Sequence, residues 1–64
     1  MRHIEAKFQD ESKAEACGRK LNALRAHAIQ VAPWEDGYIV SADVNHAVLD
    51  QALAVMRDYE GTSL

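Results

Sequence analysis

The sequence predicts a single small α+β domain over residues 1–64, with the element order β-α-β-β-α. Three observations lead to this class. Residues 2–8 alternate between apolar and polar, apolar residues then recur at helical spacing, and an Asp-Gly pair separates two segments rich in β-formers. No linker, repeat or low-complexity tract divides the chain.

The first strand and the first helix follow from a change in period. Residues 2–8 place Ile4, Ala6 and Phe8 on one side and polar residues on the other, as in a half-buried strand. Asp10 is then a good N-cap. An apolar helical stripe follows it, and Glu15 and Arg19 are spaced for an i,i+4 ion pair. The stripe is Ala14, Cys17, Leu21, Leu24 and, at its end, Ala28.

The next two strands form a predicted hairpin. His27–Trp34 and Tyr38–Val44 flank Glu35-Asp36-Gly37, and Asp-Gly favours a type I′ turn. With Asp36 and Gly37 as the loop residues, the apolar face has the pairs Pro33 with Val40, Val31 with Ala42 and Ile29 with Val44. The other face pairs Trp34 with Ile39, Ala32 with Ser41 and Gln30 with Asp43.

A second helix is predicted after this hairpin. Asn45 is the expected N-cap, with Asp43 as the competing cap, and Gly61 is the expected C′ residue. Between them lies a broad apolar face: Val48, Leu49, Ala52, Val55, Met56 and Tyr59.

These elements predict a three-stranded sheet of order 1-3-2. Pro33 cannot donate a ladder hydrogen bond, so the second strand belongs at an edge. Both helices are expected on one face, as in a ferredoxin-like fold that lacks its last strand, which leaves the outer edge of the first strand free. The covered face would hold Ile4, Phe8, Ile29, Val31, Val40 and Val44.

Two segments carry a resemblance to a known family. The run Phe8–Ala16, followed by Leu21, Leu24, Ile29 and Val31, resembles the opening unit of bacterial general-stress (heat-induced stress) proteins. Tyr38–Val44, with Ala52-Leu53 and Met56, is similar to that family's closing strand and helix. The chain departs from the family in having no glycine before the second strand and no glycine-rich loop after it. The resemblance implies a fold, and it implies no catalytic residue.

Composition narrows the functional class. The net charge of −3 and the pI near 5.4, with the basic residues scattered, disfavour nucleic-acid binding. No apolar run approaches a membrane span, and Met1–Glu5 has no signal-like apolar region. The lone Cys17 excludes an internal disulfide and fits a reducing compartment. We therefore expect a cytoplasmic protein with no membrane partner.

No motif in the sequence predicts catalysis or metal binding. His3, His27 and His46 fall at one end of the predicted sheet, but their directions differ and their spacing matches no ligand motif. Cys17 lies on the core stripe, which predicts a buried and inert thiol. No histidine lies at an obvious distance from any of the three serines, Ser12, Ser41 and Ser63. We expect no enzyme, metal or cofactor.

The positions that remain to be explained are on the face that the helices leave open. Trp34, Ile39, Ala32 and Ser41 are the predicted interface of a homo-oligomer, because a chain of this size has a thin stability margin and tryptophan is enriched at interfaces. The alternatives are a Trp–Ile pair that only stabilises the hairpin and dimerisation along the first strand. The expected function is thus a small interaction or regulatory module, with another protein as a further possible partner. The alternative function is a small-ligand or metal carrier, using the surface near Tyr38 and Tyr59 or the histidine end.

Overall fold

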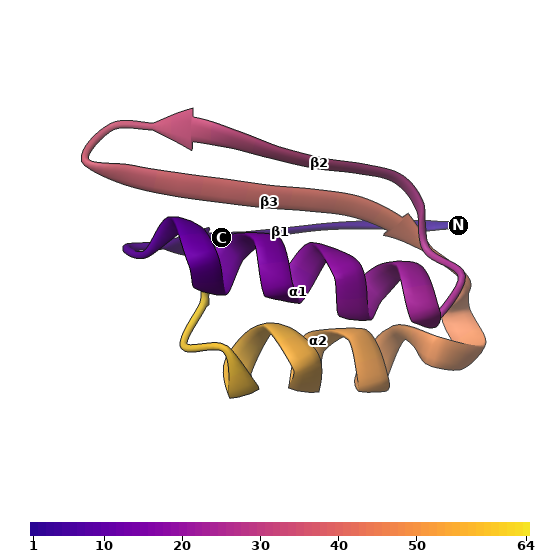
Figure 1. Cartoon of the computed structure of the whole chain (residues 1–64). Coiled ribbons are helices and arrows are strands. Elements are labelled where there is room, and N and C mark those ends of the chain that lie inside the picture. The colour runs from indigo at the N-terminus through magenta and orange to yellow at the C-terminus, as the bar shows by residue number, and fades with distance from the viewer.

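Two helices lie along one face of a four-stranded antiparallel sheet in the computed structural model, which describes residues 1–64 (Figure 1). The strand order is β2-β3-β1-β4, so β2 and β4 form the edges. A short 3₁₀ turn, η1, leads into α2. The elements are β1 (Arg2–Phe8), α1 (Glu11–Ala23), β2 (His27–Trp34), β3 (Gly37–Val44), η1 (His46–Val48), α2 (Leu49–Asp58) and β4 (Thr62–Ser63).

The predicted three-stranded sheet of order 1-3-2 is wrong, because the chain returns after α2 and adds a fourth strand. Thr62 and Ser63 pair with Lys7 and Ala6, and the Leu64 N–H donates to the Glu5 carbonyl at 3.1 Å. The fold therefore does not lack its last strand. β4 also occupies the outer edge of β1 along this stretch, where the sequence predicted a free edge.

The turn that directs β4 back to the sheet is built at the end of α2. The Gly61 N–H donates to the Met56 carbonyl and the Glu60 N–H to the Arg57 carbonyl, which is the Schellman pattern. Glu60, with φ 67°, is the C′ residue, so the prediction that Gly61 fills this position is wrong. Gly61 is needed for a different reason: a Cβ there would lie 2.5 Å from the Phe8 ring.

The core lies between the central strands and the two helices. In β1, the alternation predicted for residues 2–8 is confirmed, with Ile4, Ala6 and Phe8 buried. β3 supplies Val40, Ala42 and Val44, and the helices supply their apolar stripes. The Asp10 carboxylate caps α1 by accepting from the Ser12 N–H, and the predicted Asn45 cap is confirmed at the start of η1. The buried helical residues are Ala14, Cys17, Gly18, Leu21, Ala52 and Met56.

The hairpin forms with a register different from the predicted one. Trp34 pairs with Gly37, which makes Glu35 and Asp36 the loop residues, and Ala32 rather than Trp34 lies opposite Ile39. The shift is two residues, so each side chain keeps its predicted face. A bulge between His27 and Gln30, with Ala28 at φ 53°, changes the pairing again near the start of β2.

Gly37 is explained by close packing and not by turn geometry. Its φ is not positive, whereas Glu35 adopts φ 54°. A Cβ on Gly37 would lie only 2.4 Å from the carbonyl oxygen of Phe8. The Asp-Gly signal therefore located the hairpin correctly but assigned the wrong residues to its loop.

Arg25 ends α1 in a conformation that favours glycine. It has φ 64° at the C′ position, where its N–H donates to Asn22 and the Ala26 N–H donates to Leu21. We expect Arg25→Gly to raise the free energy of unfolding by about 1 kcal/mol, because a side chain in the left-handed region is strained. Chemical denaturation measures this change. Lys20→Gly, within α1, should lower stability by about 1 kcal/mol, and a loss of stability in Arg25→Gly would contradict the assignment.

Candidate interaction surface

β2 is the most exposed element of regular structure that carries apolar side chains. Only Ile29 among its eight residues is even half-buried, and none of the eight is Asp, Glu, Lys or Arg. The strand lies at the edge of the sheet, as Pro33 predicts. We use the name β2 surface for three parts together: the strand β2, the face of the β2–β3 hairpin that the helices leave open, and the groove between β2 and α1.

The open face of the β2 surface contains the four residues predicted as an interface. Trp34 and Ala32 are exposed, whereas Ile39 and Ser41 on β3 are half-buried. Their arrangement differs from the predicted one, because Ile39 pairs with Ala32. The Trp34 ring lies 5.4 Å from the Nζ of Lys7, a cation–π distance.

Lys7 also ties the hairpin loop to β1. Its ammonium lies 2.8 Å from Asp36 and 3.6 Å from Glu35. The hydrogen bond to Asp36 raises the pKa of Lys7 and lowers the pKa of Asp36. The loop and the Trp34 side chain are therefore held in place by one lysine from the neighbouring part of the sheet.

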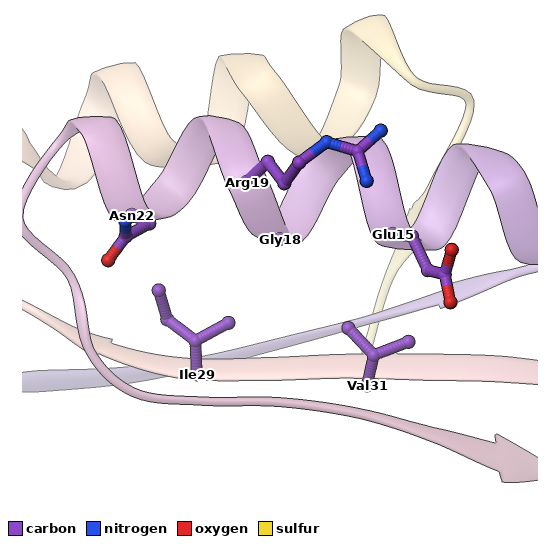
Figure 2. A pocket seen from close by; sticks show the side chains of 6 residues that line it. All are labelled: Glu15, Gly18, Arg19, Asn22, Ile29 and Val31. Atoms are coloured by element: carbon purple, nitrogen blue, oxygen red, sulfur yellow. The ribbon is translucent and has the colours of Figure 1, made fainter.

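On the helix side, the β2 surface is an open groove of about 780 Å³ between α1 and β2 (Figure 2). Ile29 and Val31 point from β2 toward α1, and Val31 is 37% exposed. The prediction that Val31 belongs to the covered core is therefore wrong, whereas Ile29 is half-buried and packs against that core. The reason is the sequence of α1 above them: Gly18 has no side chain, and its neighbours in the groove are the polar Glu15, Arg19 and Asn22.

The polar side chains of the groove have no partner within the chain. Neither Glu15 nor Arg19 forms an ion pair, so the predicted i,i+4 pair is absent. The Asn22 side chain makes no hydrogen bond. The groove thus offers a carboxylate, a guanidinium and an amide beside the exposed Val31 and the half-buried Ile29.

The backbone of β2 has free hydrogen-bonding groups along the same groove. A two-residue loop closes on a pair that exchanges both backbone hydrogen bonds, here Trp34 with Gly37. Such pairs alternate along an antiparallel ladder, so the N–H and C=O of Val31 point away from β3 toward the open edge. Pro33 is the next outward-pointing residue, and it has no N–H to leave unsatisfied.

At the far end of the open face, His3 lies between two carboxylates. Its Nδ1 is 2.8 Å from Asp43, and its Nε2 is 3.2 Å from Glu5. Hydrogen bonding to Asp43, and secondly to Glu5, raises the pKa of His3 above 6.5. No group of three or more His, Cys, Asp or Glu side chains is placed to hold a metal ion.

The raised pKa of His3 predicts a small pH dependence of stability. Its contribution is fully present below about pH 6.5 and is lost as the pH rises through the folded-state pKa, because only the protonated ring benefits from both carboxylates. NMR titration of the His3 ring should show a pKa above 6.5 that falls in Asp43→Asn. An unchanged pKa in that variant would contradict the pairing.

Cys17 is completely buried in α1, as its place on the core stripe predicts. Burial raises the pKa of its thiol to about 11. At pH 8 only roughly one thiol in a thousand would then be ionised. We expect thiol reagents to modify the native protein no faster than it unfolds, and rapid modification of the folded chain would contradict this.

The structure unites some of the residues that the sequence singled out and separates others. Trp34, Ala32 and Ile39 lie together, and His3 and His27 both lie opposite Asp43, at the predicted end of the sheet. Tyr59, by contrast, lines a surface hollow that does not include Tyr38. The groove was missed altogether. Its one sequence signal is Gly18, a glycine inside a helical pattern.

Comparison with protein-family models, with curated proteins and with solved structures finds no match. None of the helices is long and apolar enough to cross a membrane.

Proposed function

We propose that this chain is a small protein-interaction module that works as a homo-oligomer through its β2 surface. The observation that carries the proposal is a mainly apolar, uncharged edge strand that is exposed on both faces. Large contiguous apolar patches on a protein surface mark contact sites, and the unpaired N–H and C=O groups of an edge strand form a template for pairing with another chain.

The element order β-α-β-β-α-β is one that ferredoxin-like folds also have. Folds of this kind carry many unrelated functions, so the arrangement itself does not select one. The resemblance to general-stress proteins also leaves the partner open. The site therefore supports an interaction role, for which no catalytic group is needed.

Sedimentation equilibrium from low to high micromolar concentration tests the proposal. We expect the average mass to exceed that of the 7.1 kDa chain and to rise with concentration. Trp34→Ala, measured beside the parent chain, tests whether the open face belongs to the contact. A parent chain that stays monomeric throughout would refute self-association.

A further inference from the structure

We propose that the occupant of the groove is a second copy of this chain, bound around a two-fold axis at the level of Gly18 and Gln30. In this dimer β2 runs antiparallel to the partner's β2, and α1 packs antiparallel to the partner's α1. The inference deepens the proposed function and rests on it. The two sheets become one, with the four helices on the same side.

The position of the axis follows from the centre of the groove. A Cβ built on Gly18 would lie 3.3 Å from Val31 Cγ2 and 3.7 Å from Ile29 Cγ2, so Gly18 sits above the stretch between these side chains. Figure 2 shows Glu15 on one side of Gly18 and Asn22 on the other, along α1. A two-fold axis at this level places the apolar Ile29 and Val31, and the polar Glu15 and Asn22, of the two chains symmetrically about the centre of the contact.

The spacing between neighbouring strands brings the α1 helices of the two chains into contact. α1 packs on both β2 and β3. Because neighbouring strands are about 4.8 Å apart, pairing of the two β2 edges would place the α1 axes about two strand spacings, or ~10 Å, apart. Helices pack at about 8–10 Å. Because Gly18 has no side chain where the two helices cross, their axes can approach to the shorter distances in this range.

Under this two-fold symmetry, the carboxylate of the groove in one chain comes near the guanidinium of the groove in the other chain. In two antiparallel helices centred between residues 18 and 19, Glu15 lies opposite the partner's Asn22 and about one turn from the partner's Arg19. Each of these side chains is unpartnered in the single chain. The two Arg19 residues are near the axis. In the single chain the Arg19 side chain extends along α1 toward its own Glu15 (Figure 2), so the pair with the partner's Glu15 forms when Arg19 turns toward Asn22, a rotamer change of the kind common at interfaces.

The length of the strand pairing is limited at both ends. The bulge with Ala28 lies before the free stretch and Pro33 lies after it. Both features restrict edge-to-edge pairing. The contact therefore joins a short segment around Gln30, in which Val31 lies opposite the partner's Ile29, and the symmetric arrangement closes at two chains.

Complementary charge reversal tests the helix contact. Glu15→Arg and Arg19→Glu each place like charges across the proposed axis, so each variant alone should dimerise at least about tenfold more weakly than the parent. An equimolar mixture should recover dimerisation as a heterodimer, which native mass spectrometry resolves by mass. No preference for the heterodimer in the mixture would overturn the arrangement.

Val31→Lys tests the strand contact, with Leu64→Lys as its matched control. Both residues are exposed aliphatic side chains that gain the same charge, but Val31 faces the groove and Leu64 follows β4 at the opposite edge of the sheet. We expect at least about a tenfold weaker dimer for Val31→Lys and little change for Leu64→Lys. Equal loss in both variants would overturn the groove contact while self-association stands. A monomeric parent chain would refute the proposed function itself.

Discussion

Phe8→Ala is expected to leave the chain largely unfolded at 25 °C. The Phe8 side chain is 1% exposed and is among the largest fully buried side chains. Removing a buried phenylalanine costs about 3–5 kcal/mol through lost burial and the remaining cavity. A single core of this size supplies only about 3–5 kcal/mol in total, so the substitution removes most of the stability margin.

The position of Phe8 makes this loss larger than that of an average core residue. Its ring contacts the backbone at Gly61, which leads into β4, and its carbonyl lies against Gly37 at the start of β3. Circular dichroism during urea unfolding measures the effect, with Phe8→Leu as a control that should cost less than about 1.5 kcal/mol. A cooperative transition in Phe8→Ala with the parent midpoint would contradict this role.

Gly37→Ala is expected to be the most damaging single-methyl change at a glycine. The added Cβ would lie 2.4 Å from the Phe8 carbonyl oxygen and 3.4 Å from its carbon. Because the obstacle is backbone in the central pair of strands, β1 and β3 must separate to relieve the collision. We expect a loss of at least about 2 kcal/mol, in the upper range for overpacked sites.

Gly18→Ala is the matched control for Gly37→Ala. Its Cβ would meet the end of the exposed Val31 side chain at 3.3 Å and the Ile29 side chain at an ordinary contact distance of 3.7 Å. The Val31 side chain can turn into the open groove, and alanine favours the helix by about 1 kcal/mol over glycine. Stability should therefore be unchanged or slightly raised when measured at low concentration. Equal losses in the two variants would show that the contact with Phe8 is not the cause.

Local patterns in the sequence predicted the helices and the first three strands, because each has a clear period or cap. β4 could not be found in this way. Two residues cannot show an alternating pattern, and Thr62 and Ser63 are exposed and polar. The strand exists because the end of α2 turns the chain back against Phe8, which is a tertiary effect.

The candidate site was predicted only in part, for related reasons. Trp34, Ala32 and Ile39 share a face because strand alternation survives a two-residue shift in register. Their pairing changed because Gly37 is required beside Phe8 and is thus excluded from the loop. The groove arises from the polar side of α1 lying over Ile29 and Val31. Sequence periodicity describes each element separately and does not show this juxtaposition.

The central claim is that the free edge of β2 pairs with the same edge of a second chain, and hydrogen exchange at the Val31 amide tests it most directly. In a single chain this N–H points to solvent, whereas in the dimer it donates to the partner strand. NMR should therefore show exchange that slows as the protein concentration rises through the dimerisation range. If the chain is dimeric by mass and the Val31 amide still exchanges as fast as that of an exposed loop residue, the β2 edge is not the contact.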